Sequence, residues 1–358
     1  MRIPTIQVPT VETPAARTSA VRTSAVRTSA VRIPTFQDVL AAGERIAPVV
    51  RRTPVLRLPG TRVLLKREDL QKSGSFKLRG VTNAFAAAAP ARVVTASSGN
   101  HGKAVAMLAR AAKVPATVVM TAASAPEKVE TIRGLGARVL FVEGGVAERN
   151  RLAEALAAEQ GATLIPSSDH ADVIAGQGTT GLEIAAQTTG VDAVYVPVGG
   201  GGLLAGMCLA KEAWLAAPAV IGVEPVSAPR YALSLATGRP VSVPPSTSVA
   251  DGLRGQAPGR VALPVVAAGV DHLTVVEDDE IVRAMALLRT HGIVAEPSSA
   301  AAVAAALEAD HARDVVVVLT GGNIARSRFD ELTGREDQVS REIQVSREIH
   351  PYAALAAA

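Results

Sequence analysis

The segment Ser73-Gly74-Ser75-Phe76-Lys77-Leu78-Arg79-Gly80 stands between a short apolar stretch, 63–66, and a helical pattern that continues through Phe85. This order predicts Lys77 in the first turns of a helix, beside an aromatic residue. Burial and a helix N-terminus both disfavour an ammonium group and lower its pKa. A lysine of that kind can form a Schiff base. An ordinary solvated helix lysine fits the same segment, so both interpretations stay open at this point.

Short apolar stretches alternate with longer helical patterns through most of the chain. This alternation is typical of an α/β protein with open, mostly parallel sheets and helices on both faces. Ligands in such folds bind beyond the carboxyl ends of the strands, where the next loop starts a helix. The expected strands are 63–66, 93–96, 117–120, 138–142, 163–165, 193–198, 220–223, 273–276 and 315–319. Besides the helix that carries Lys77, the expected helices are 36–47, 100–112, 126–135, 146–159, 179–188, 203–215, 279–289 and 297–307.

The composition is that of an ordinary soluble protein. The chain has 358 residues, of which 48% are hydrophobic and 20% charged, and it is long enough for one large and one small domain. No apolar stretch reaches the roughly 18 residues that a membrane span needs, and the N-terminus lacks the apolar region of a secretory signal. Because Cys208 is the single cysteine, no disulfide can form within the chain, and we expect a reducing, cytoplasmic location.

Both ends of the chain are repetitive. Arg-Thr-Ser-Ala-Val occurs three times in succession from Arg17, and Gln-Val-Ser-Arg-Glu-Ile occurs twice from Gln338. We expect residues 1–35 to form a disordered arm, although an acid-poor segment of this kind also fits an organelle transit peptide, and residues 331–358 to form a tail. The net charge of +4 comes from the arm. A neutral body with few aromatic residues gives no sign of nucleic-acid binding.

The first polar strand end is Ser97-Ser98-Gly99-Asn100-His101-Gly102, directly after the strand expected at 93–96. Hydroxyls, an amide and free N–H groups at a helix N-terminus form a natural carboxylate site. An ordinary helix cap fits the loop too, but it needs only one of these residues. A histidine in such a place is more often structural than a catalytic base.

Four glycines, Gly199–Gly202, follow the strand expected at 193–198 and precede Leu203. Glycine lets the backbone come close to an anion, and the next helix offers its N–H groups, so we predict a phosphate site here. A tight turn is the alternative, although it needs only one or two glycines.

The glycine loop also allows a rival interpretation. Gly200, Gly202 and Ala205 satisfy the spacing of a dinucleotide-binding loop, and Glu224 stands near the position of a ribose-binding acid. The protein would then be an NAD-dependent oxidoreductase. This alternative gives Lys77 no role.

A third strand end, Thr320-Gly321-Gly322-Asn323, offers the neutral hydroxyl of Thr320, although it also fits a simple turn. The six histidines never pair at helical metal spacing, and the sequence contains neither a CxxC pair nor a Gly-x-Ser-x-Gly elbow. Patterns for a metal cluster and for a serine nucleophile are therefore missing.

An imine-forming lysine, a phosphate loop, a carboxylate loop and a neutral hydroxyl together describe a site for pyridoxal phosphate. The chain resembles the pyridoxal-phosphate enzymes of fold type II, which share the tryptophan synthase β-subunit-like fold, and among them the threonine/serine dehydratase and serine racemase group. The matching motifs, in family order, are Lys66–Gln71, Gly74–Gly80, Ser97–Gly102, Ala175–Thr179, Pro197–Gly206, Ala250–Gly252, Glu296–Pro297 and Thr320–Asn323.

The resemblance implies a role for each site residue. Lys77 would bind the cofactor covalently and take the α-proton, and Phe76 would pack near the ring. Ser98 matches the residue that serves racemases as acid and base on the opposite face. The remaining implied contacts are Thr320 with the ring nitrogen, Asn100 with the ring hydroxyl, Gly199, Gly200, Gly201, Gly202 and Leu203 with the phosphate, Gly252 and Glu296 with the cofactor, and Ser97, Asn100 and His101 with the substrate carboxylate.

The implied reaction is β-elimination from L-threonine or L-serine, which yields a 2-oxo acid and ammonia. A hydroxyl partner leaves the cofactor ring less protonated than a carboxylate would, and this favours rapid loss of a β-hydroxyl. Alternatives are a serine racemase, which Ser98 permits, a dehydratase of another β-hydroxy amino acid, and an inactive binding relative, which would need a damaged Lys77 or glycine loop. A homodimer is also implied.

One position departs from the racemase-like pattern. Those relatives bind a divalent cation through a Glu, a small-residue carbonyl and an Asp. Here Glu224 and Ala228 fit the first two, but Arg230 stands where the Asp is expected. This puts the metal in doubt, and the charge of Arg230 could substitute for it.

The resemblance also implies a domain plan. A small domain, 92–164, would be inserted into a large cofactor-binding domain formed by 36–91 and 165–330. After the Thr320 loop there is no room for a regulatory domain of ordinary size, so feedback by an end-product amino acid is not expected.

Overall fold

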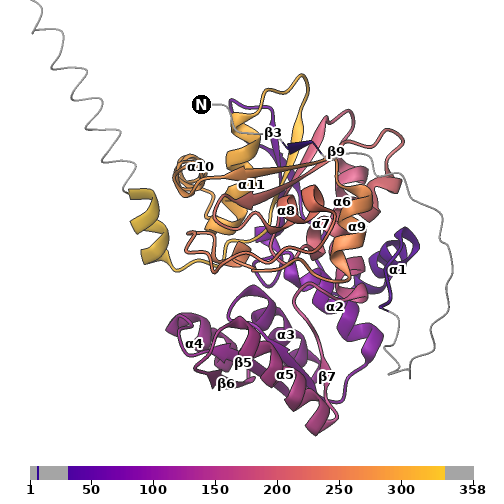
Figure 1. The fold of residues 1–358 in the computed structure, drawn as a ribbon, viewed down its shortest axis with the longest axis vertical. Coiled ribbons are helices and arrows are strands. Elements are labelled where there is room, and N and C mark those ends of the chain that lie inside the picture. Colours follow the sequence, from indigo (N-terminus) through magenta and orange to yellow (C-terminus); the bar gives the residue numbers. More distant parts are fainter. Residues whose placement is uncertain (1–5, 8–30, 335–358) are drawn as a thin grey trace, which may run out of the picture.

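The computed structural model of the chain describes residues 6–7 and 31–334. Two β-sheets with helices make up this part of the chain, one in the upper and one in the lower half of Figure 1. The expected α/β class with two mostly parallel sheets is confirmed. Most of the N-terminal arm and the C-terminal repeats lie outside the described residues.

The larger sheet has seven strands, and its inner strands are all parallel to one another. Only the two outer strands, β1 and β2, run antiparallel to their neighbours. In spatial order the strands are β1 (Ile6–Gln7), β10 (His272–Val276), β9 (Ala219–Pro225), β8 (Ala193–Pro197), β11 (Val315–Leu319), β3 (Val63–Arg67) and β2 (Val55–Arg57).

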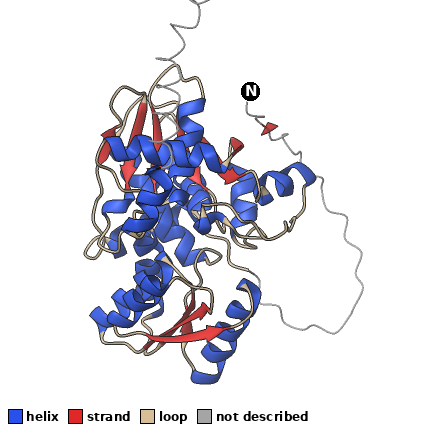
Figure 2. Ribbon diagram, turned by 90° about the vertical axis from the view of Figure 1, so that its left-hand side faces the viewer, coloured by secondary structure: helices blue, strands red, loops and turns tan. Residues whose placement is uncertain are grey.

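The smaller sheet has four parallel strands, and helices cover both of its faces (Figure 2). In spatial order its strands are β6 (Arg138–Val142), β5 (Ala116–Thr121), β4 (Val93–Ala96) and β7 (Thr163–Leu164). The helices of this part are α3 (Asn100–Ala112), α4 (Pro126–Gly134) and α5 (Val146–Gln160).

The remaining helices surround the larger sheet (Figure 1). They are α1 (Phe36–Ile46), α2 (Lys77–Ala88), α6 (Ala171–Gln187), α7 (Gly202–Ala210), α8 (Arg230–Thr237), α9 (Ala262–Gly269), α10 (Asp278–Thr290) and α11 (Pro297–Glu308). Short 3₁₀ turns occur at Glu68–Leu70 (η1), Lys211–Ala213 (η2) and Asp251–Leu253 (η3). Residues 326–334 are also helical, so this helix extends four residues into the segment 331–358 that the sequence predicts as a tail.

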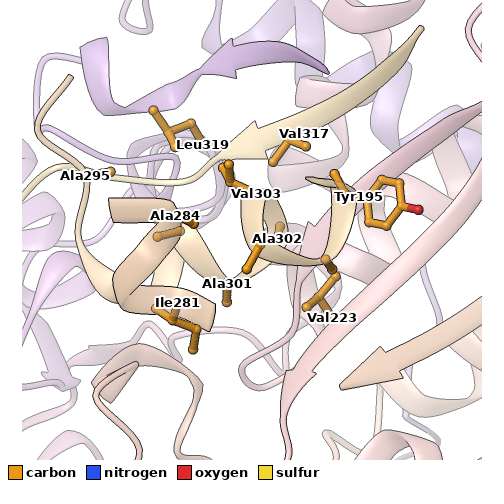
Figure 3. Close-up of a cluster of buried hydrophobic side chains, with 14 of the residues drawn as sticks. Tyr195, Val223, Ile281, Ala284, Ala295, Ala301, Ala302, Val303, Val317 and Leu319 are labelled. Atoms are coloured by element: carbon orange, nitrogen blue, oxygen red, sulfur yellow. The ribbon is translucent and has the colours of Figure 1, made fainter. Parts of the chain in front are cut away.

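The core of the large sheet is built around α11, whose residues Ala300–Ala306 are at most 4% exposed. Small side chains let this helix lie close to the sheet, between β8, β9 and β11 on one side and α10 on the other (Figure 3). The adjoining strand β11 is a run of buried valines, as expected for a parallel strand covered on both faces.

Helix α6 begins well before residue 179, where the sequence predicts its start. Gly176 and Gly178, which resemble a helix break in the sequence, lie inside α6 where neighbouring helices pack against it. A Cβ on Gly176 would stand 2.7 Å from the Arg79 carbonyl oxygen of α2, and one on Gly178 would stand 2.7 Å from the Gly206 carbonyl oxygen of α7. The two glycines therefore let α6 pack closely against both α2 and α7.

Within the part of the chain that the structure describes, we find no helix whose length and apolar character would let it cross a lipid bilayer. Of the predicted arm, residues 6–7 pair with β10. Arg32 also forms ion pairs with Asp38 and, at 3.0 Å, with Asp172.

Candidate active site

Lys77 is the first residue of α2 and lies at the carboxyl-end side of the large sheet. Its Nζ donates a hydrogen bond to the Ser167 carbonyl oxygen at 2.8 Å and lies 4.9 Å from the centre of the Phe76 ring. Burial lowers the pKa of Lys77 to about 8, although the nearby Glu296 carboxylate opposes this change. An appreciable fraction of the side chain is therefore a neutral amine near physiological pH.

The segment that carries Lys77 is joined by its backbone to the loop after β11. Phe76 N–H donates to the Thr320 carbonyl oxygen at 2.9 Å, and Gly322 N–H donates to the Gly74 carbonyl oxygen at 3.1 Å. Gly74 has a φ of +77°, a conformation that glycine adopts without strain. The predicted lysine and the predicted ring-nitrogen partner are thus held side by side.

The glycine loop is enclosed so tightly that a side chain has no room. A Cβ on Gly200 would stand 2.0 Å from Ser168 Oγ, and one on Gly201, whose φ is +85°, would stand 1.8 Å from the Tyr231 hydroxyl. A Cβ on Gly199 would similarly stand 2.7 Å from the Gly252 carbonyl oxygen.

Helix α7 starts at Gly202 with no side-chain cap. The N–H groups of its first turn, which includes Leu203, are therefore available to an anion. A bare backbone cradle at an uncapped helix start fits the phosphate of the implied cofactor.

The carbonyl groups of this loop are held by the start of α8. The Tyr231 hydroxyl donates to the Gly200 carbonyl oxygen at 3.0 Å and accepts from Gly259 N–H at 3.1 Å. Arg230 donates to the carbonyl oxygens of Val198, at 2.7 Å, and Gly199. These bonds fix the peptide orientation on which a phosphate site depends.

Thr320 is buried at the end of β11, where its hydroxyl lies 2.8 Å from Ser299 Oγ. Ser299 Oγ in turn bonds both the N–H and the carbonyl oxygen of Gly321, each at 2.7 Å. Thr320 is therefore held by another hydroxyl, which carries no charge.

Asn100 and Glu296, both expected to contact the cofactor, contact each other. The Asn100 amide donates to the two Glu296 carboxylate oxygens at 2.8 and 3.0 Å, and its own oxygen accepts from Asn323 Nδ2 at 2.7 Å. Asn323 also donates to the Ser73 carbonyl oxygen at 2.9 Å and accepts from Lys103 at 2.6 Å. Burial raises the pKa of Glu296 to about 7, and the Asn100 hydrogen bond opposes that rise.

The loop expected to bind a carboxylate leads into α3. Ser97 Oγ accepts from Gly99 N–H at 3.2 Å, and α3 starts at Asn100 without a side-chain cap. The His101 ring lies 2.9 Å from the Ile165 carbonyl oxygen, and burial lowers its pKa to about 3. The neutral ring is committed to Ile165, so the main-chain N–H is what His101 can offer a carboxylate.

Ser98 belongs to a chain of hydroxyl groups. Its Oγ accepts a hydrogen bond from Ser124 Oγ at 2.7 Å, and Ser124 Oγ lies 3.2 Å from Thr121 Oγ1. Such a chain can orient the Ser98 proton.

The expected metal ligands do not fit a divalent cation. Glu224 is fully buried, and its two oxygens accept the N–H groups of Tyr231 and Ala232 at 3.0 Å each. Arg230 approaches the same carboxylate to 3.4 Å and donates to the Ala228 carbonyl oxygen at 2.8 Å. No group of three or more His, Cys, Asp or Glu residues among the described residues could hold a metal ion.

The same contacts weaken the dinucleotide alternative. An acid that binds a ribose must present free carboxylate oxygens to the ligand. Those of Glu224 are buried and occupied.

Several residues around the site are not among the predicted site residues. They are Ser167 and Ser168, which lie between Lys77 and the glycine loop, Tyr231, and Gln177, whose buried amide atoms have no partner among the described residues. Only the motif 175–179 pointed toward Gln177. The serines and Tyr231 stand in segments without a motif, so only the fold brings them to the site.

Comparison with known proteins gives one consistent result. A family model described as "Pyridoxal-phosphate dependent enzyme" matches residues 46–321. The chain is 36% identical to the L-threo-3-hydroxyaspartate ammonia-lyase of Saccharomyces cerevisiae over 85% of this chain and 98% of the relative. It is 33% identical to the serine racemase of Schizosaccharomyces pombe, over 83% and 96%, and 35% identical to the L-threonine ammonia-lyase of Thermotoga maritima, over 84% and 78%.

Solved structures show the same fold. Maize serine racemase superposes with a TM-score of 0.79 at 31% identity, over 87% of this chain and all of that one. The T.th. threonine deaminase superposes with a TM-score of 0.77 at 40% identity, over 82% of this chain and 99% of that one.

Proposed function

The chain belongs to the pyridoxal-phosphate-dependent enzymes of fold type II, in their ammonia-lyase and racemase group, and within that group we propose that it releases ammonia from a β-hydroxy L-amino acid, L-threonine or L-serine. The observation that carries the proposal is the meeting of three parts. The Lys77 segment is hydrogen-bonded to the Thr320 loop through the backbone. Lys77 Nζ donates a hydrogen bond to the Ser167 carbonyl oxygen, and the next residue, Ser168, packs against Gly200 of the glycine loop.

Each part has a task in β-elimination. The glycine loop and the start of α7 would hold the cofactor phosphate. The first turn of α3, together with Ser97, would hold the substrate carboxylate and so orient the bond from Cα to its hydrogen. The Lys77 amine, kept partly neutral by burial, would take that proton.

Bound pyridoxal phosphate supplies the electron sink that makes the α-proton acidic. A hydroxyl rather than a carboxylate opposite the ring nitrogen, as Thr320 provides, supports rapid loss of the β-hydroxyl over other outcomes.

The experiment is a substrate screen of the purified, cofactor-loaded protein. L-Serine, L-threonine and L-threo-3-hydroxyaspartate are each assayed for 2-oxo acid and ammonia, beside chiral analysis of serine. We expect a yellow protein whose colour borohydride bleaches and which deaminates L-serine or L-threonine. A Lys77→Ala variant should lack both the bleachable colour and the activity. A wild-type protein that stays colourless after addition of pyridoxal phosphate would contradict the proposal.

A second candidate substrate is L-threo-3-hydroxyaspartate, because two relatives that are 36% and 35% identical carry that activity in their names. A second carboxylate on the substrate needs a cation. Arg149 of α5 is half-buried and close enough for its charge to lower the pKa of His101 further, after burial and Lys77. Its Nε has no partner among the described residues, and its Nη2 reaches only Asn150 Oδ1, at 3.5 Å.

This candidate is tested by Arg149→Gln, with the exposed Arg151→Gln on the same helix as the control. If hydroxyaspartate is the substrate, the first variant should raise its KM at least tenfold and leave kinetics with L-serine nearly unchanged, while the control matches wild type. Equal effects on both substrates would show that Arg149 does not bind the β-carboxylate.

A further inference from the structure

Arg230 is among the most deeply buried charged residues of the described chain, with no exposed surface. It begins α8. Its Nη1 donates to the Ala228 carbonyl oxygen at 2.8 Å and lies 3.4 Å from Glu224 Oε1. A cationic group thus contacts the two groups of this chain, the Glu224 carboxylate and the Ala228 carbonyl, that match metal ligands of racemase-like relatives.

The second terminal nitrogen of the same guanidinium, Nη2, contacts the backbone that leads into the glycine loop. Nη2 donates to the carbonyl oxygens of Val198, at 2.7 Å, and Gly199. One side chain therefore connects the Glu224 carboxylate with the backbone that leads into the phosphate cradle. The planar fork of arginine suits this task, because its donors diverge in fixed directions.

A divalent cation has no place beside this group. Metal ions of this class need several oxygen ligands at about 2.0–2.6 Å, whereas here the oxygens receive N–H donors. A Cβ on Gly255 would stand only 3.2 Å from Arg230 Nε, so the guanidinium also packs closely against the backbone of Gly255. A positive charge at the site adds electrostatic repulsion.

We propose that Arg230 is a built-in cation that replaces a divalent metal: it neutralises Glu224, fixes the carbonyl groups of Val198 and Gly199, and makes cofactor binding independent of divalent ions. Arg230 is a positioning residue, since it acts through the loop. The inference rests on the proposed phosphate site at Gly199–Gly202. It does not depend on which amino acid is the substrate.

The first test uses the wild-type holoenzyme, treated with EDTA and then with MgCl₂. We expect the melting temperature and the dissociation constant for pyridoxal phosphate to stay unchanged, the latter within twofold, and metal analysis to find no bound divalent ion. A loss of cofactor affinity in EDTA that MgCl₂ restores would overturn the proposal. Neither readout measures turnover, so failure of the proposed reaction would be seen separately.

The second test restores the acidic residue. Arg230→Asp should bind pyridoxal phosphate at least tenfold more weakly in EDTA, and MgCl₂ should recover affinity and raise its melting temperature. Arg239→Asp makes the same charge change at an exposed arginine just beyond α8, and it should behave as wild type. An Arg230→Asp variant with wild-type affinity in EDTA would overturn the inference.

A third variant covers the case in which Arg230→Asp does not fold. Arg230→Lys keeps the charge but has a single donor group. It should bind pyridoxal phosphate several-fold more weakly than wild type and should not respond to MgCl₂. If MgCl₂ tightened cofactor binding by Arg230→Lys, a metal ion could bind beside the positive charge at position 230. That result would contradict the proposal that Arg230 replaces the metal.

Discussion

The Ser98 hydroxyl is the group expected to exchange a proton on the face of the substrate opposite Lys77. We predict that Ser98→Ala abolishes serine racemisation and use of D-serine while L-serine elimination falls less than about tenfold, because elimination needs only the Lys77 side of Cα. Chiral chromatography and a 2-oxo acid assay measure the two activities on one sample.

The neighbouring hydroxyl provides the control for this prediction. Ser124→Ala removes the donor to Ser98 but keeps the Ser98 hydroxyl, so racemisation should weaken without vanishing. Equal loss of elimination and racemisation in Ser98→Ala would argue against its assigned role.

The lowered pKa of Lys77 makes a prediction about pH. With a pKa of about 8 rather than 10.5, the neutral amine makes up about a tenth of the population at pH 7, instead of less than about a thousandth. The rate at which cofactor-free protein takes up pyridoxal phosphate should therefore rise about tenfold per pH unit up to about pH 8 and then level off. Stopped-flow absorbance follows the uptake, and a rate that climbs steadily to pH 10 would contradict the shift.

At the scale of helices and strands, close packing of α6 yields a prediction about stability. Gly178→Ala would push a methyl group against the Gly206 carbonyl oxygen of α7, so we expect a loss of about 1–3 kcal/mol in unfolding free energy. Gly134→Ala, at the exposed end of α4, meets nothing within 4 Å and should be neutral or stabilising by up to about 1 kcal/mol. Chemical denaturation compares the two, and equal effects would exclude the packing argument.

The same helix shows what sequence patterns can and cannot predict. The inner strands of both sheets and most helices were predicted within a few residues, because buried parallel strands are continuous apolar runs. Gly176 and Gly178 misled the prediction of α6, since glycine lowers helix propensity while the need for a close helix contact is a property of the assembled fold. β2, α8 and α9 were missed because they are short, at three, eight and eight residues.

The site divides in the same way. The glycine loop and Thr320 follow strand ends and Lys77 begins a helix, and these are local features from which the sequence predicts them as site residues. The contacts of Tyr231, Ser167 and Arg149 depend on which strand ends lie together, which one sequence does not show.

For the molecule as a whole, the site draws on both sheets. The α3 loop comes from the small sheet, and the glycine loop and Lys77 come from the large one. Asn100 bonds Glu296 across this boundary. Lys128 of α4 also pairs with Asp251 of η3 at 2.7 Å, although such an exposed pair adds little stability. The relative position of the two sheets therefore decides whether the loop predicted to bind the substrate carboxylate faces Lys77.

The large sheet keeps Lys77 in place through a buried ion cluster just behind it. Arg79 of α2 bonds Glu68 of η1 and Glu183 of α6, at 2.7 and 2.8 Å, and Glu183 also pairs with Lys66 of β3. Four charges, from segments far apart in the chain, thus hold α2 against β3 and α6. Burying them is costly, so the cluster stabilises the fold only while it is complete.

We predict that Arg79→Met lowers the unfolding free energy by about 3–5 kcal/mol, because it leaves the Glu68 carboxylate buried without its partner. Adding Glu68→Gln should recover part of this loss by removing the stranded charge. Arg57→Met, which breaks the exposed pair with Asp314, is the matched control and should barely change the denaturation midpoint. If both single variants shifted that midpoint equally, the buried cluster would contribute no more stability than an exposed ion pair. Another contact would then have to hold Lys77 at the start of α2.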